Sequence, residues 1–206
     1  MTWNIIAQLV ISGLALGFIY SLVAIEYTII FNSTGLLNFS HDKFILIGTY
    51  IFAAQFITRM STNYAVGIIS TIIVMFLFGV LVSMGIFNPL RNMASPIFAV
   101  MGTVFLGRII TECVRLIWGP IPFTLSGFMK GTVQIGSVII TKANLTIICV
   151  SALLVLALQF FFKKTKTGKA MRCVQQNKTA SVLVGINVSR NINITIALSA
   201  VICATI

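Results

Sequence analysis

The sequence predicts an all-α fold, a polytopic bundle of transmembrane helices. Of its 206 residues, 58% are hydrophobic and only 8% are charged, whereas about 25% of the residues in an average soluble domain are charged. The apolar residues gather in runs of roughly 20, the length of a helix that crosses ~30 Å of hydrocarbon. A soluble fold could not cover so much apolar surface. We therefore expect residues 1–206 to form a single transmembrane domain.

Six apolar runs follow one another along the chain. Five are long enough for complete spans, and they cover approximately residues 4–31, 36–57, 65–87, 96–118 and 143–162. The sixth run, 192–206, has about 15 residues against the ~20 that a span needs. We therefore expect about five complete spans plus the start of a sixth, in a chain truncated at its C-terminus.

The first span carries small residues at every fourth position. Gly13, Gly17 and Ser21 form a stripe on it, and such stripes let the backbone of another helix approach closely. Turn-forming residues at 32–35 then separate this span from the second. Non-helical backbone at membrane depth is tolerated only where it lines protein or a water-filled cavity. We therefore expect a broken or re-entrant element between the two spans.

Local signals mark the ends of the next two spans. Asn88-Pro89 follows the third span, and a proline at this place stops a helix. Trp118 closes the fourth span and suits a membrane interface. Residues 119–142 contain prolines, several glycines and short apolar stretches, a pattern typical of an exposed loop with a small hairpin.

Basic residues predict the orientation of the chain in the membrane. Half of the fourteen Lys and Arg residues lie between Lys163 and Arg190, and loops rich in these residues stay in the cytoplasm. This makes 163–190 a cytoplasmic loop and 119–142 an extracytoplasmic loop, with Arg91 inside and the N-terminus outside. The net charge of +11 does not indicate a nucleic-acid partner, because the basic loop lacks aromatic stacking groups and a folded basic face.

A polar patch lies at the start of the second apolar run and holds the only histidine of the chain. It consists of Asn38, Ser40, His41, Asp42 and Lys43. Charged groups next to hydrocarbon are costly, so they usually face a cavity, a partner helix or a transported solute. With Glu26 of the first span, these residues are our candidates for a translocation path. A structural hydrogen-bonding role for His41 at a helix start is an equally good interpretation.

Motifs for catalysis, cofactors and metals are absent from the sequence. The cysteines have no C-x-x-C spacing and no histidine near them in the sequence, which favours apolar packing roles: they are Cys113, Cys149, Cys173 and Cys203. An intramembrane hydrolase needs a paired Asp, a Ser/His set or a metal set within the spans. Gly168-Lys169 lacks the rest of a nucleotide-binding P-loop. We therefore expect a protein that is not an enzyme and binds no cofactor or metal.

Several short motifs, taken in order, resemble one family of membrane proteins. They are Gly17-Phe18-Ile19-Tyr20, Tyr27-Thr28, Gly35-Leu36-Leu37-Asn38-Phe39-Ser40-His41, Gly48-Thr49-Tyr50, Asn88-Pro89-Leu90-Arg91, Thr167-Gly168-Lys169-Ala170 and Gly185-Ile186-Asn187. Together they resemble the permease subunits of branched-chain amino acid ABC importers. The resemblance implies a multi-pass permease of the bacterial cytoplasmic (inner) membrane, here incomplete. It also implies a second permease subunit, cytoplasmic ATPase subunits and an extracytoplasmic solute-binding protein as partners.

The resemblance also gives the loop 163–190 a role, because a cytoplasmic helix in such importers docks into a groove of the ATPase. Apolar residues at mixed three- and four-residue spacing, interleaved with basic ones, are typical of a short docking helix. The coupling candidates are Lys169, Met171, Arg172, Val182, Leu183, Gly185 and Ile186. The alternative is a solvated basic loop that only fixes topology.

The resemblance implies a hydrophobic amino acid as substrate, namely leucine, isoleucine or valine. Import of urea or a short amide stays open, because relatives of this type handle those solutes and selectivity rests mainly with the binding protein. A membrane-embedded fragment without transport is a further alternative.

The chain departs from the family pattern at three positions. Relatives favour glycine where Glu26 stands and His-Gly-Glu where His41-Asp42-Lys43 stands. One interpretation is that Glu26 and Lys43 form an ion pair that preserves a network along a cavity. The other, which we favour slightly, is a decaying or mutagenised gene. Lys43 is expected at or near the cytoplasmic end of the second span if the first two spans each cross once.

Overall fold

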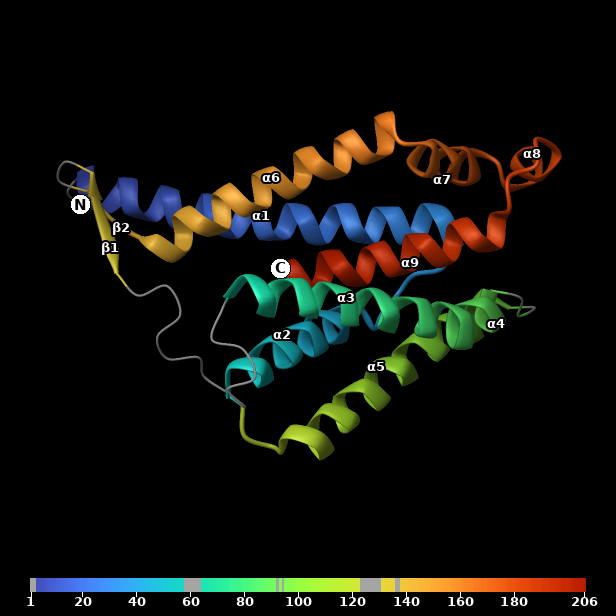
Figure 1. Cartoon of the computed structure of the whole chain (residues 1–206), viewed down its shortest axis with the longest axis horizontal. Helices are drawn as coiled ribbons and strands as arrows, with labels where there is room; N and C mark the ends of the chain where they lie inside the picture. Colours follow the sequence, from blue (N-terminus) through green and yellow to red (C-terminus); the bar gives the residue numbers. More distant parts are fainter. Residues whose placement is uncertain (1–2, 58–63, 92, 94, 123–130, 136–137) are drawn as a thin grey trace.

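The computed structural model describes the whole chain except residues 1–2, 58–63, 92, 94, 123–130 and 136–137. It is a bundle of long helices that run roughly along one axis, with a small β-hairpin at one end (Figure 1). The helices are α1 Trp3–Thr34, α2 His41–Ile57, α3 Tyr64–Val82, η1 Ser83–Phe87, α4 Asn88–Arg91, α5 Pro96–Trp118, α6 Lys142–Lys164, α7 Lys166–Gln176, α8 Lys178–Leu183 and α9 Val188–Thr205. The strands are β1 Thr132–Ile135 and β2 Val138–Thr141.

The predicted all-α, multi-pass membrane fold is confirmed. Within the described residues, five helical segments are long and apolar enough to cross a membrane: Trp3–Thr34, Ala65–Arg91, Ile97–Trp118, Lys142–Lys164 and Val188–Thr205. Two details differ from the prediction. The second apolar run forms only the 17-residue helix α2, and the last run is longer than expected because α9 begins at Val188.

A π-helical turn, η1, joins α3 to α4 within one continuous apolar segment. Its wide backbone is held by side chains: the Ser83 hydroxyl donates to Asn193 Oδ1 at 2.8 Å, and Asn88 Nδ2 donates to the same oxygen at 3.1 Å. The segment then ends at Arg91, two residues after Pro89, close to where the sequence predicted its end. Polar contacts of this kind fix the register of helices inside a membrane protein.

Helix α9 lies at the centre of the bundle, where it packs against α1, α2 and α3. Its neighbours approach closely through glycines. A Cβ atom at Gly48 of α2 would lie 2.9 Å from the Cα of Ala204, and one at Gly79 of α3 would lie 2.7 Å from the Cα of Ala197. Small residues at such crossings increase van der Waals contact, which drives helix association in lipid. By contrast, no other part of the described chain lies within 4 Å of a Cβ built on Gly13 or Gly17.

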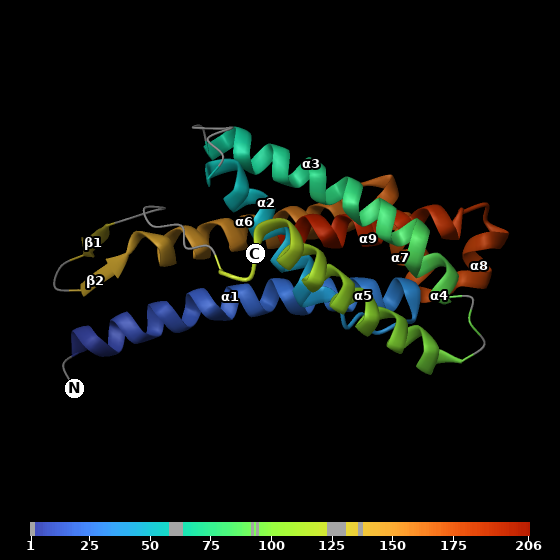
Figure 2. The same cartoon turned by 90° about the horizontal axis from the view of Figure 1, so that it is seen from below.

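Different elements lie at the two ends of the bundle. The N-terminus and the antiparallel hairpin of β1 and β2 lie at one end, whereas α4, α7 and α8 lie at the other (Figures 1 and 2). Arg91 Nη2 donates to Ser189 Oγ at 3.2 Å, which ties α4 to the start of α9. The predicted hairpin is therefore present in the described part of 119–142, and Arg91 lies at the same end as the basic loop 163–190, as the charge pattern predicted.

Candidate functional site

The connection between α1 and α2 runs back into the bundle before α2 begins (Figure 1). Helix α1 ends at Thr34. The next residue, Gly35, has a positive φ of 78° that suits a glycine, and its N–H donates to Phe31 O at 2.8 Å. Beyond it, Thr103 Oγ1 accepts a hydrogen bond from Phe39 N at 3.2 Å and contacts Leu37 O at 3.4 Å. Since Thr103 lies well inside the membrane-spanning helix α5, the extended segment 35–40 lies at membrane depth. The expected break between the first two runs is therefore present.

Asn38 and Ser40 shape the start of α2. Asn38 Oδ1 accepts from Ser40 N at 3.0 Å and from Ser40 Oγ at 2.6 Å. The Ser40 carbonyl then accepts from the N–H groups of Lys43 and Phe44 and so starts the helix. Both polar side chains are buried, and Asn38 Nδ2 has no hydrogen-bond partner within the described residues. The segment thus supplies its own capping groups and leaves one buried donor available.

A buried cluster of four polar side chains joins α1, α2 and α9. Glu26 is completely buried, and its carboxylate contacts His41 Nδ1 and accepts a hydrogen bond from the Ser199 hydroxyl. Cys203 Sγ lies 3.5 Å from the same ring nitrogen. The ring of Tyr27 packs against His41 with a centroid distance of 4.7 Å. Because a lone charge in a membrane interior is costly, Glu26 persists there through these partners.

Lys43 pairs with Asp42 and not with Glu26, which contradicts the interpretation in which Glu26 and Lys43 form an ion pair. Lys43 Nζ lies 2.6 Å from Asp42 Oδ2, with side chains 33% and 62% exposed in this chain. Lys43 also does not lie at the cytoplasmic end of a span. Its Cγ lies 3.4 Å from the position of a Cβ at Gly107, halfway along α5. The chain thus has two separate pairs. Glu26 and His41 form the buried pair, and Asp42 and Lys43 form a partly exposed pair halfway along α5.

Ser199 and Cys203 belong to the buried cluster, yet sequence reasoning missed both. They lie more than 160 residues from their partners in the chain, and serine and cysteine are ordinary residues in a transmembrane helix. Cys203 is therefore not only a packing residue, in contrast to the prediction. The other three cysteines, Cys113, Cys149 and Cys173, are exposed and unpaired in the described structure.

Comparison with known proteins identifies the family. The family described as the permease component of the branched-chain amino acid transport system matches residues 9–206. The chain belongs to this family. It is 30% identical over 210 residues to the high-affinity branched-chain amino acid transport system permease protein LivH of Salmonella typhimurium, a match that covers 96% of this chain and 68% of LivH. The permease protein BraD of Pseudomonas aeruginosa is 28% identical over 208 residues, with the same two coverages. No solved structure matches the chain.

The match confirms the resemblance to branched-chain amino acid permeases. All the relatives named above are transport permease proteins, and the chain has five helices suited to membrane spans. The protein is therefore a multi-pass membrane permease of this family.

Helix α7, the first of two short helices in the loop 163–190, packs against the bundle through its apolar face. Thr165 Oγ1 caps it by accepting from Gly168 N at 3.0 Å. Met171 and Val174 are buried, and Gln175 Nε2 donates to Ser33 Oγ at 3.2 Å near the end of α1. Met171 was a docking candidate, but the structure directs it inward. Two other candidates on this helix, Lys169 and Arg172, are exposed.

Helix α8, the second short helix of this loop, lies at the same end of the molecule as α4 and α7 (Figure 1). Lys178 Nζ donates to Thr34 O at 3.0 Å and so joins α8 to the end of α1; burial, and then the nearby Arg91, lower the pKa of Lys178. Val182, Leu183 and Val184 are exposed, Leu183 by 83%. Gly185 is exposed with a positive φ, whereas Ile186 packs partly against the core.

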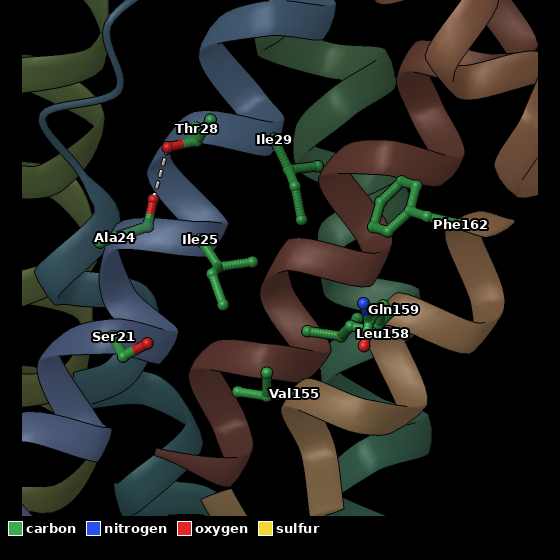
Figure 3. A pocket seen from close by; sticks show the side chains of 9 residues that line it. All are labelled: Ser21, Ala24, Ile25, Thr28, Ile29, Val155, Leu158, Gln159 and Phe162. Carbon is green, nitrogen blue, oxygen red and sulfur yellow. Dashed lines mark hydrogen bonds between the residues drawn. The ribbon is translucent and has the colours of Figure 1, made fainter. Parts of the chain in front are cut away.

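A groove of about 530 Å³ lies between α1 and α6 of the permease (Figure 3). Its lining is mainly apolar and consists of Ser21, Ala24, Ile25, Thr28, Ile29, Val155, Leu158, Gln159 and Phe162. The Thr28 hydroxyl donates to Ala24 O of its own helix at 2.7 Å and therefore offers little to a ligand. The groove contains none of the predicted path residues.

Proposed function

We propose that this permease is the membrane subunit of a bacterial ABC importer for leucine, isoleucine or valine. It works in the cytoplasmic membrane with a second permease subunit, cytoplasmic ATPase subunits and an extracytoplasmic solute-binding protein. The names of its relatives support the substrate class. The observation that carries the proposal for this chain is the Asp42–Lys43 pair at mid-depth.

An exposed ion pair at this depth cannot face lipid without a large penalty. A single charge at the centre of a bilayer costs a few kcal/mol or more, and more than half of the Asp42 side chain is exposed in the isolated chain. The surface that carries the pair is therefore covered in the assembled protein, by a second permease subunit or by a water-filled path. In our proposal the path for the solute runs along this surface and so passes the break between α1 and α2.

The same segment has the mixed chemistry that a hydrophobic amino acid requires. Leu37 and Phe39 are exposed and offer apolar contacts, while Asn38 Nδ2 is a buried donor without a partner in the described structure. The solute has an aliphatic side chain and a charged carboxylate, so it needs both kinds of surface. We therefore assign the path to Glu26, Asn38, Ser40, His41, Asp42 and Lys43, with Leu37 and Phe39 beside them.

The tip of α8 is the proposed contact with the ATPase. Apolar side chains exposed at a polar membrane surface favour a protein partner. Val182, Leu183 and Val184 provide such a surface, and Lys169 and Arg172 are exposed on the neighbouring helix α7. Gly185 then permits the turn back toward α9, whereas Met171 holds α7 against the bundle.

Uptake of radiolabelled leucine tests this proposal in cells that lack their own branched-chain uptake and express the permease with its partner subunits. We expect Asp42→Asn to reduce uptake at least tenfold, because Lys43 then loses its counter-charge at mid-depth. Glu112→Gln is the matched control: it breaks the exposed Glu112–Arg115 pair (3.5 Å) near the end of α5 and should leave uptake unchanged.

Competition with unlabelled solutes tests the substrate class in the same cells. Valine and isoleucine should compete with leucine, whereas urea and acetamide should not. Competition by urea alone would favour the amide-importer alternative. Full uptake by Asp42→Asn would refute the role of the ion pair, and an absence of any uptake would refute the importer itself.

A further inference from the structure

We propose that Glu26, His41 and Cys203 form a binding site for a divalent transition metal such as Zn²⁺. A carboxylate oxygen, an imidazole nitrogen and a thiol sulfur come from three different helices, and these atoms all lie within 4.8 Å of one another. All three side chains are buried. Glu26 and His41 also belong to the proposed path, but metal binding requires neither a partner subunit nor a solute, so it can be tested separately from transport.

The separation of Cys203 and His41 matches that of two ligands in a tetrahedral metal site. Zinc binds nitrogen and oxygen at about 2.0–2.2 Å and sulfur at about 2.3 Å, so two ligand atoms of a tetrahedral site lie about 3.3–3.8 Å apart. Cys203 Sγ and His41 Nδ1 are separated by 3.5 Å. Glu26 Oε2 is in direct contact with the same nitrogen, so the two side chains would move slightly apart to admit a metal ion between them.

The charges of the site also favour a divalent ion. A carboxylate and a thiolate carry two negative charges, the imidazole is neutral, and the metal supplies two positive charges. The occupied site is then neutral overall, which reduces the cost of burying Glu26 in an apolar interior. Mixed sulfur, nitrogen and oxygen ligands select zinc-like metals over Mg²⁺ or Ca²⁺, which prefer oxygen alone.

Ser199 supports the carboxylate from outside the ligand set. Its hydroxyl donates to one oxygen of Glu26, and such hydrogen bonds orient a ligating carboxylate. The three ligands leave the fourth tetrahedral position to water or another group. The bound metal would connect α9 to both sides of the break between α1 and α2.

Cobalt spectroscopy on the purified full chain in detergent tests this inference directly. We expect Co²⁺ to bind one ion per chain and to give visible d–d bands together with a near-ultraviolet thiolate-to-cobalt band, and Zn²⁺ to remove both. Cys203→Ser should abolish the thiolate band and weaken Zn²⁺ binding at least tenfold, and Glu26→Gln should weaken binding similarly. Cys149→Ser is the matched control, because Cys149 is an exposed cysteine in a membrane helix, and it should change neither signal.

The unmodified chain keeps the test decisive if a variant does not fold. Micromolar Zn²⁺ should raise its unfolding temperature in a saturable way, since a ligand that binds only the folded state stabilises it; Mg²⁺ should not. The inference is overturned by an unmodified chain without a thiolate-to-cobalt band, or by one whose unfolding temperature does not respond to Zn²⁺. A band that persists in folded Cys203→Ser would overturn it as well.

Discussion

Thr103 is the residue on which the non-helical segment at membrane depth most depends. Its hydroxyl accepts from Phe39 N and donates within its own helix to Val100 O at 2.8 Å. Backbone N–H groups away from water must be paired, and no water is present in hydrocarbon to replace a lost partner. A side chain of α5 therefore makes the re-entrant course of residues 35–40 possible.

Replacing Thr103 with valine should destabilise the protein by about 1–3 kcal/mol, because the Phe39 N–H then lacks an acceptor while side-chain volume is preserved. Thr111→Val is the matched control, since Thr111 Oγ1 donates only to Gly107 O of its own helix at 2.9 Å. Thermal unfolding in detergent should show a lower midpoint for Thr103→Val alone. Equal midpoints for both variants would mean that Thr103 does not hold the segment.

Part of the candidate site could be predicted from the sequence because its residues are unusual where they occur. The sequence alone shows polar or charged residues beside or within long apolar runs: Glu26, Asn38, Ser40, His41, Asp42 and Lys43. Ser199 and Cys203 carry no such contrast, and only the packing of α9 against α1 and α2 brings them to Glu26 and His41. The interpretation that paired Glu26 with Lys43 failed for the same reason: the fold places His41 beside Glu26, whereas Lys43 contacts Asp42.

An apolar run predicted that the helix α2 exists but not the residue at which it begins. Residues 36–57 are apolar enough for a span, but Asn38 bonds Ser40 in a turn, and the helix starts only at His41. The part of the run before His41 instead forms extended backbone against α5. The start of α2 is instead determined by the hydrogen bonds of Asn38 with Ser40 and by the contact of Phe39 with Thr103 of α5.

Close approach of α3 to α9 gives a prediction at the level of elements. Gly79→Ala should destabilise the bundle by about 1–3 kcal/mol, the usual cost of overpacking, because the added Cβ would lie 2.7 Å from Ala197 Cα and 2.8 Å from Ala200 Cβ. Gly17→Ala is the matched control, because no other part of the described chain lies within 4 Å of its Cβ position.

The two glycine variants should differ in how they change the stability of the folded protein. Gly17→Ala should be neutral or slightly stabilising, since alanine favours helix more than glycine does. Thermal unfolding in detergent compares the two proteins, and size-exclusion chromatography checks that both are folded. If Gly79→Ala unfolds at the same temperature as Gly17→Ala, the tight crossing of α3 and α9 is not a feature of the folded protein.

At the scale of the whole molecule, the distribution of charge and the fold agree. The basic residues of 163–190 predicted one cytoplasmic end, and the structure gathers α4, α7 and α8 at a single end, opposite the hairpin (Figure 1). The reason is general: charged residues cannot cross the hydrocarbon easily, so their order in the chain reports topology. Which side of the membrane each end faces follows from the charges alone and needs its own test.

Labelling of single cysteines with a membrane-impermeant maleimide tests this orientation. In one variant Cys173 of α7 remains while the other cysteines become serine; in the second, all four become serine and the exposed Gln134 of β1 becomes cysteine (Gln134→Cys). In intact cells we expect Gln134→Cys to react and Cys173 to remain unlabelled, and after permeabilisation both should react. The opposite pattern would invert the orientation. Labelling of both in intact cells would contradict a bundle whose hairpin and α7 lie at opposite ends of its membrane-spanning helices.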